Sequence, residues 1–79
     1  MRLAKKARLR FDRHAGRWMI MYPERGLALN ESGAAIAQKL DGTRTLAQIV
    51  AELVAERGAN EADIHAFIAD LETKGLVEK

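Results

Sequence analysis

Residues 22–32, YPERGLALNES, contain the change from strand to helix that decides the fold. Pro23 presets φ for a turn and Gly26 relaxes the backbone, so an apolar strand cannot run straight through this segment. Helical periodicity begins directly after Asn30, which is a favoured N-cap residue. The segment therefore predicts a turn, a short strand and then a helix.

The strand predicted within this segment is only three residues long, LAL at 27–29. Leu27 and Leu29 share one face, and Ala28 occupies the other. A strand at the edge of a sheet keeps one row of N–H and C=O groups unpaired, which another chain can use. We predict that this short strand is such an edge.

The chain before this segment predicts a β-hairpin. Apolar and charged residues alternate from residue 7 to residue 12, which is typical of a half-buried strand. His14, Ala15 and Gly16 form the connection, in which Gly16 can adopt positive φ. The core-facing residues of this first strand are Ala7, Leu9 and Phe11.

The returning strand, residues 18–22, is apolar on both faces. Trp18, Ile20 and Tyr22 point one way, whereas Met19 and Met21 point the other. One set can enter the core, and the other must be covered by the rest of the chain, by a partner or by a second subunit. The methionines therefore leave a core position and a homodimer contact both open.

Three amphipathic helices follow, each introduced by a capping residue. Asn30 caps the first helix, Thr45 with Gln48 forms a capping box for the second, and Asn60 caps the third. Asp41 and Gly42, Gly58, and Lys74 and Gly75 are the respective ends. The apolar stripes are Gly33, Ile36 and Leu40; Leu46, Ile49, Val50, Leu53 and Val54; and Ile64, Phe67, Ile68 and Leu71. Leu76 and Val77 then return to the core.

These elements predict one α+β domain over residues 1–79, with three short antiparallel strands followed by three helices. The order is similar to a winged helix-turn-helix. A chain of 79 residues buries about 60 to 65% of its unfolded surface, which leaves little room for a large catalytic cavity. Residues 1–6 are expected to form a flexible basic lead.

Composition narrows the functional classes. The chain has no Cys, which excludes disulfides, thiolate nucleophiles and Cys-type zinc sites. The N-terminal stretch MRLAKKARLRF is basic but lacks an apolar signal region, and no apolar run reaches the roughly 20 residues of a membrane span. We expect a cytoplasmic protein with no membrane partner.

Candidates for catalysis are few. His14 lies in the hairpin connection, and His65 lies beside the apolar stripe of the third helix with no metal-ligand partner at i+4. Ser32 falls in the first turn of a helix, where capping is its usual role. No glycine-rich phosphate-binding pattern occurs. We therefore expect neither an enzyme, nor a cofactor, nor a metal.

Charge is distributed unevenly along the chain. Residues 1–29 carry eight Lys or Arg against Asp12 and Glu24, a balance of +6, whereas residues 45–79 balance at −4. The alternative function for this fold is a winged-helix protein that binds nucleic acid. However, the third helix has Lys74 alone against four carboxylates, which would repel phosphates. Nucleic acid is therefore not the expected partner.

Five segments resemble the PqqD family, the peptide chaperones of pyrroloquinoline quinone (PQQ) biosynthesis. They are RLRFD at 8–12, YPERG at 22–26, LNESGAAI at 29–36, DGTRTLAQIV at 41–50 and DIHAFIADLETKGLV at 63–77. Together they span nearly all of the chain. The opening MRLAKKA departs from the family, whose members often bring a proline-containing lead into the first strand.

The resemblance implies a domain that does no chemistry itself. It would bind a ribosomally made precursor peptide and present it to a radical S-adenosylmethionine enzyme, which joins a Glu and a Tyr of that peptide. The peptide would add a strand beside the third strand and pack against the third helix. The implied peptide-binding residues are Leu27, Ala28 and Leu29 on the strand and Ile64, Phe67, Ile68 and Leu71 on the helix. Arg25 is a further candidate, because its guanidinium could bind a carboxylate of the peptide.

Overall fold

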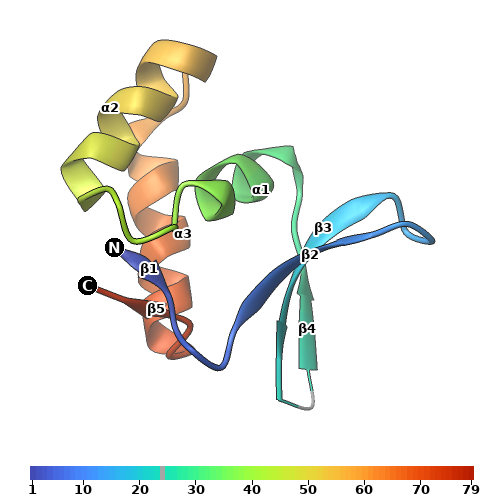
Figure 1. The fold of residues 1–79 in the computed structure, drawn as a ribbon. Coiled ribbons are helices and arrows are strands. Elements are labelled where there is room, and N and C mark those ends of the chain that lie inside the picture. Colours follow the sequence, from blue (N-terminus) through green and yellow to red (C-terminus); the bar gives the residue numbers. More distant parts are fainter. Residues whose placement is uncertain (24) are drawn as a thin grey trace.

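The computed structural model describes residues 1–23 and 25–79 and confirms the α+β class. Three helices follow a three-stranded antiparallel sheet, and two further short strands pair with each other (Figure 1). The strands are β1 (Arg2–Leu3), β2 (Arg8–Asp12), β3 (Arg17–Tyr22), β4 (Arg25–Ala28) and β5 (Val77–Glu78). The helices are α1 (Glu31–Gln38), α2 (Leu46–Arg57) and α3 (Glu61–Thr73).

The predicted hairpin is present as β2 and β3. Phe11 pairs with Trp18 and Leu9 pairs with Ile20, so these side chains share the face that the alternation assigned to them. Gly16 has φ of 68°, as the connection requires. Phe11 differs from the prediction, because 46% of it is exposed at the far end of the hairpin.

Strand β4 begins earlier than the sequence suggested. Arg25 already pairs with Tyr22, and Gly26 pairs with Met21, so the turn is shorter than predicted. Glu24, which belongs to the predicted turn, lies outside the described residues. At the other end, Leu29 follows the strand and is 5% exposed.

All three predicted caps are confirmed. The side chain of Asn30 accepts from the N–H of Gly33 at 2.7 Å, and that of Asn60 accepts from Asp63 at 3.2 Å. Thr45 and Gln48 form the reciprocal capping box. The buried stripe of α2 is narrower than predicted, because Val54 is 41% exposed whereas Ile49, Val50 and Leu53 are buried.

Residues 1–6 do not form a flexible lead in this structure. β1 pairs with β5, with Arg2 opposite Glu78 and Leu3 opposite Val77. The N–H of Leu3 donates to Leu40 O at 3.2 Å, and the N–H of Ala4 donates to Leu76 O at 2.8 Å. The basic composition suggested a flexible segment, but composition does not reveal backbone pairing, and these hydrogen bonds order the segment. Two strands therefore join the first and last residues of the chain beside α3 (Figure 1).

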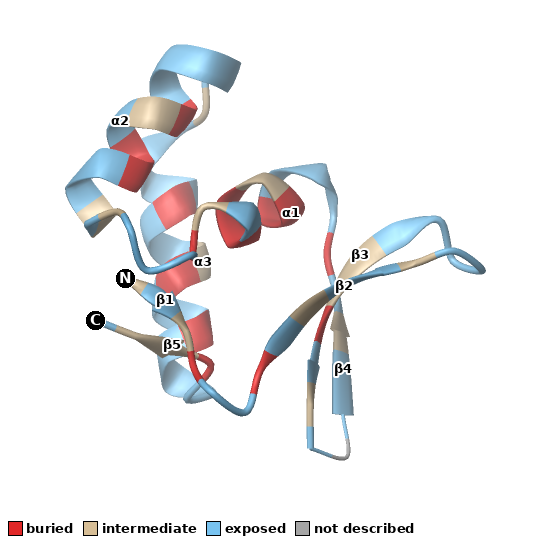
Figure 2. Ribbon diagram, in the orientation of Figure 1, coloured by how far each residue is buried: buried red, intermediate tan, exposed pale blue. Residues whose placement is uncertain are grey.

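The core forms where the three helices meet one face of the sheet (Figure 2). No described polar or charged residue is buried in it. The fully buried side chains come from β3, α2, α3 and the segment after α3: Ile20, Ile49, Leu53, Ile64, Ile68, Leu71 and Leu76. The sheet thus has one face in the core and one face outside.

Candidate functional site

The free edge of β4 is the first feature of the candidate site. Strand order is β2-β3-β4, so β4 pairs on one side only. The N–H of Leu29 donates to Trp18 O at 2.9 Å, and hydrogen-bonded pairs alternate along an antiparallel ladder. The backbone N–H and C=O groups of Leu27 and Arg25 therefore also point toward β3. The N–H and C=O groups of Gly26 and Ala28 point the other way, to the free edge. These four backbone groups are what β4 offers to another chain.

Strand β2 forms the opposite edge of the sheet and is protected. Its exposed residues include Arg8 and Arg10, and charged side chains discourage pairing at an edge. Gly26 and Ala28, by contrast, carry no side chain beyond Cβ and are exposed. The two edges therefore differ, and β4 is the one open to strand addition.

The structure separates the residues predicted to form the facing wall. Ile64, Ile68 and Leu71 are at most 1% exposed, so they are core residues with no surface for direct contact. Phe67 is half-buried and lies against α1: a Cβ built on Gly33 would be 3.0 Å from its Cε1 atom. Of the predicted helix residues, Phe67 is the one that reaches the surface.

Phe67 borders a pocket of about 260 Å³ between α1, the end of α2 and the start of α3. Asn30, two residues after the end of β4, also lines this pocket. Asn30 and the Phe67 ring therefore line one pocket, on either side of the first turn of α1. Leu27 is half-buried on the core face of β4 and packs against the core cluster that Phe67 also contacts.

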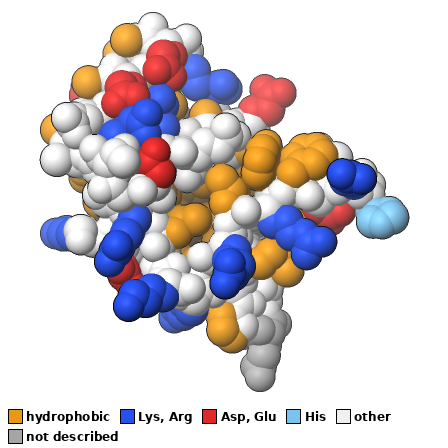
Figure 3. Space-filling model, viewed as in Figure 1, with side chains coloured by type: hydrophobic (Ala, Val, Ile, Leu, Met, Phe, Trp, Pro, Cys, Tyr) orange, Lys and Arg blue, Asp and Glu red, His pale blue; other side chains and the backbone are white. Residues whose placement is uncertain are grey.

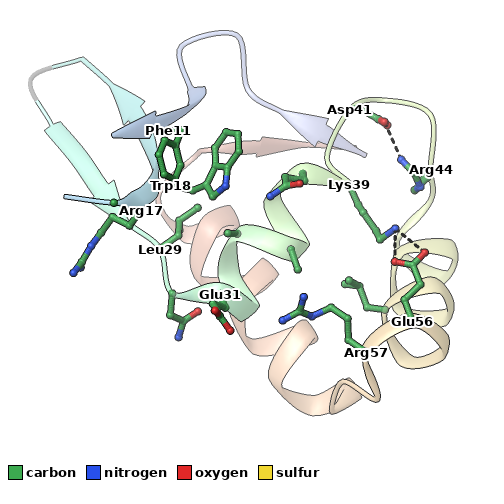
Figure 4. Close-up of a pocket in the computed structure, with 16 residues that line it drawn as sticks. Phe11, Arg17, Trp18, Leu29, Glu31, Lys39, Asp41, Arg44, Glu56 and Arg57 are labelled. Atoms are coloured by element: carbon green, nitrogen blue, oxygen red, sulfur yellow. Dashed lines mark hydrogen bonds and ion pairs between the residues drawn. The ribbon is translucent and has the colours of Figure 1, made fainter. Parts of the chain in front are cut away.

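A second, larger cavity of about 750 Å³ lies between the end of the β2–β3 hairpin, α1 and α2. Phe11 and Trp18 stand at one end as an edge-to-face pair, with ring centroids 5.4 Å apart (Figure 4). Ala34 and Ala35 of α1 line its floor, and Arg57 of α2 lines another side. Asn30 and Arg57 line both cavities, so α1 stands between two adjoining hollows.

Sequence reasoning missed this aromatic end of the second cavity. Phe11 and Trp18 were assigned to the core face by alternation, which is correct in direction. The two residues lie at similar distances on either side of the hairpin connection. This spacing could have predicted that they become direct cross-strand partners.

An ion-pair cluster forms the far wall of the larger cavity. Lys39 Nζ lies 3.1 Å from Glu56 Oε1 (Figure 4). It also lies 3.0 Å from Glu52 Oε1, and Arg44 Nε lies 2.9 Å from the same oxygen. Hydrogen bonds from Lys39 and then Arg44 hold the pKa of Glu52 below its ordinary value. The same bonds raise the pKa of Lys39 and of Arg44. These charges are paired with one another, so they are occupied in holding α1, α2 and their connection together.

Asp41 begins the same connection and is held by Thr43. Its carboxylate accepts from the Thr43 hydroxyl at 2.6 Å and from the Thr43 N–H at 3.0 Å, and Arg44 lies 2.8 Å away. These donors lower the pKa of Asp41 from 3.8 to about 2, the Thr43 hydroxyl being the largest cause. The carboxylate form is therefore favoured in the folded state.

The surface charges follow the asymmetry of the sequence. Lys and Arg side chains dominate the visible strand half, whereas acidic side chains gather over α2 together with their basic partners (Figure 3). All four carboxylates of α3, Glu61, Asp63, Asp70 and Glu72, are exposed. His14, His65 and Ser32 are exposed as well. The described residues include no group of three side chains able to hold a metal ion, and none of their helices is long and apolar enough to cross a membrane.

This arrangement of strands and helices has counterparts among known proteins. A family model described as "Coenzyme PQQ synthesis protein D (PqqD)" matches residues 17–77. The chain belongs to the PqqD family. Among its PqqD relatives is a protein named "PqqA binding protein" from Xanthomonas oryzae pv. oryzae strain PXO99A, 47% identical over 64 residues, which are 81% of this chain and 70% of the relative. A protein of the same name from Rhodopseudomonas palustris strain HaA2 is 39% identical over 79 residues, covering 95% of this chain and 78% of the relative.

Two solved PqqD structures have the same fold. The solution structure of the PqqD truncation of Methylobacterium extorquens PqqCD has a TM-score of 0.72 and 33% identity, covering 99% of this chain and 87% of that one. It is described as a functional, stand-alone recognition element for ribosomally synthesized and post-translationally modified peptides. The crystal structure of PqqD from Xanthomonas campestris has a TM-score of 0.63 and 34% identity, covering 100% of this chain and 92% of that one.

The Asp41 contacts predict a specific dependence of stability on pH. Because the folded-state pKa of about 2 lies below the ordinary 3.8, this carboxylate stabilises the fold above about pH 4, and the contribution is lost as pH falls toward 2. Melting temperatures of the parent chain and Asp41→Asn should therefore differ at pH 5 and converge at pH 2. Asn keeps the size of the side chain, and a gap that stays constant over this range would show that the Asp41 charge adds no stability.

Proposed function

We propose that the domain binds the precursor peptide of PQQ by strand addition at β4. It then presents the peptide to a radical S-adenosylmethionine enzyme in the cytoplasm, and that enzyme joins a Glu and a Tyr of the peptide. The observation that carries the proposal is the edge of β4, where Gly26 and Ala28 offer unpaired backbone groups beside small side chains. Membership of the PqqD family, and the names of its relatives, support a peptide as the occupant.

Strand addition explains why so small a domain can hold a flexible peptide. The peptide backbone would bond to the N–H and C=O groups of Gly26 and Ala28 and thereby extend the sheet. Alternate peptide side chains would then lie on the core side, next to Leu27 and toward the half-buried ring of Phe67. Backbone pairing would supply affinity, and this apolar side would supply selectivity.

Arg25 would add a polar contact at the start of β4. It is exposed and lies opposite Tyr22, on the same face of the sheet as Leu27. Its guanidinium can form two parallel hydrogen bonds with a carboxylate of the peptide. Such a contact would fix the register of the added strand, since main-chain pairing alone accepts several registers.

The affinity expected from these contacts is moderate. About four main-chain hydrogen bonds contribute about 1 kcal/mol each, and a few hundred Å² of apolar burial adds about 25 cal/mol/Å². Ordering the flexible peptide offsets much of this sum. We expect dissociation constants from the micromolar to the high-nanomolar range.

Amide hydrogen exchange, resolved by NMR, tests strand addition directly. In the free domain the outward N–H groups of Gly26 and Ala28 should exchange quickly, whereas those of Leu27 and Leu29 are already bonded to β3. Saturation with the precursor peptide should protect Gly26 and Ala28 and leave Leu27 and Leu29 nearly unchanged. The distant connection His14–Gly16 is the internal control. Unaltered exchange at Gly26 and Ala28 in the saturated complex would rule out pairing at this edge.

A proline substitution tests the same edge by affinity. Ala28→Pro removes an N–H that β3 does not use, and proline is tolerated on edge strands when its position faces solvent. The variant should fold, yet bind the peptide at least about fivefold more weakly, because one hydrogen bond is lost. Calorimetric titration measures the affinity, and the melting temperature reports the fold. Folded protein with full affinity would argue for a different binding surface.

The ring of Phe67 provides a test of the apolar side. Because the ring is half-buried, Phe67→Ala should cost less than the about 3 to 5 kcal/mol typical of a fully buried Phe, while weakening peptide binding. Leu71→Ala is the matched control: that side chain is 0% exposed, so its loss should lower the melting temperature by more. If Phe67→Ala binds the peptide as the parent chain does, the ring has no part in the site.

A further inference from the structure

The outer face of the sheet is a second exposed surface, which the backbone pairing proposed at the β4 edge leaves largely uncovered. Ile20 is 0% exposed in the core, so Met19 and Met21, its neighbours on β3, point to the opposite face. Met19 pairs with Arg10 and Ala28, and Met21 pairs with Arg8 and Gly26. These six residues form one continuous surface across the three strands, which we call the outer face.

The methionines lie toward β4. A Cβ built on Gly26 would be 2.9 Å from Met19 Cε and 3.2 Å from Met21 Sδ, so both side chains extend over Gly26. Met21 is nevertheless 38% exposed. Thioether side chains are polarizable and adapt to many shapes, which suits them to a surface that another protein covers. The apolar part of the outer face thus lies directly beside the edge at which the peptide would add.

The opposite side of the outer face is basic. Arg8 and Arg10 are exposed on β2, and Arg17 shares their face by alternation. Within the described part of the chain, no ion pair joins these three arginines to a carboxylate. Asp12, opposite Arg17, is an acidic residue of the same face, and its carboxylate accepts from the N–H groups of His14 and Ala15. The face therefore presents positively charged side chains beside an apolar centre formed by the two methionines.

We propose that the outer face binds an acidic, partly apolar surface of the enzyme that receives the peptide. Its carboxylates would face Arg8 and Arg10, and its apolar side chains would cover Met19 and Met21. The inference rests on the proposed function, because β4 then contributes its edge to the peptide and its outer face to the enzyme. The bound peptide would lie at the border of the enzyme interface, where it can be transferred to the catalytic centre.

Charge selects this partner over the other classes. The same face of a second copy would offer these arginines Asp12 alone among the described residues, and that carboxylate already accepts from the N–H groups of His14 and Ala15. Nucleic acid would contact the arginines but leave the methionine centre uncovered, and the exposed carboxylates of α3 would oppose it. A protein surface that combines carboxylates with apolar side chains satisfies both parts of the face.

The experiment measures binding of the radical S-adenosylmethionine enzyme to outer-face variants. Arg8→Glu/Arg10→Glu should weaken enzyme binding at least about tenfold, because charge pairs become repulsive. Met21→Gln, which keeps the length of the side chain, should weaken it by a smaller factor. The double variant Arg13→Glu/Lys79→Glu changes net charge equally at exposed positions off this face and should change enzyme binding less than about twofold. Parent-chain affinity should also fall between about 0.05 and 0.3 M salt.

Separate measurements keep this inference distinct from the proposed function. Peptide titration of the same variants should match the parent chain, and failure of the parent chain to bind peptide would count against the proposed function alone. The outer-face inference is overturned if Arg8→Glu/Arg10→Glu binds the enzyme as tightly as the parent chain does, or if the parent chain does not bind it. Two further results would overturn it: a dimer of the parent chain in ultracentrifugation that Arg8→Glu/Arg10→Glu abolishes, or binding of duplex DNA that the same variant abolishes.

Discussion

The register of β4 against β3, seen in the hydrogen bond from the N–H of Leu29 to the carbonyl of Trp18, is the constraint on which the sheet depends. It aligns β4 with β3 so that Leu27 and Leu29 join the core side while Gly26 and Ala28 stay outside. A slip of one residue would reverse these faces and expose both leucines. It would also exchange the backbone groups at the free edge. The register therefore sets the core, the edge and the outer face together.

The sequence was most informative where local chemistry decides local structure. Asn30, Thr45 and Asn60 each marked a helix start, because a capping side chain must lie within a few residues of the N–H groups it accepts from. Alternation also placed Ile20 and Met21 on opposite faces, because the direction of a side chain in a strand depends only on its position along that strand. The pairing of β1 with β5 could not be predicted, since it joins residues 76 positions apart and two-residue strands have no periodicity. Nor could helical periodicity tell Phe67, which is half-buried, from the fully buried Ile68, because burial depends on which element packs over each turn.

The apolar stripe of α3 is divided between the core and a pocket at the surface. Ile64, Ile68 and Leu71 are consumed in holding α3 to the rest of the domain, which leaves Phe67 to face the pocket next to Gly33. The glycine is what allows α1 to approach that ring closely. In so small a chain, few apolar residues are spare, so backbone groups at the sheet edge carry a large part of any interaction. Contacts of this kind favour reversible rather than permanent binding.

The pairing of β1 with β5 places the N-terminal and C-terminal residues of the domain next to each other. Arg2 lies opposite Glu78, so the two ends of the described chain are neighbours in one small ladder. A short linker could therefore join them with little loss of chain entropy, and new ends could be opened in an exposed connection such as residues 13–16. The same adjacency means that a domain fused at either end would emerge on one side of the molecule, beside α3. Circular permutation and tethered fusions are thus compatible with the fold, with the linker rather than the core setting the distance to any attached module.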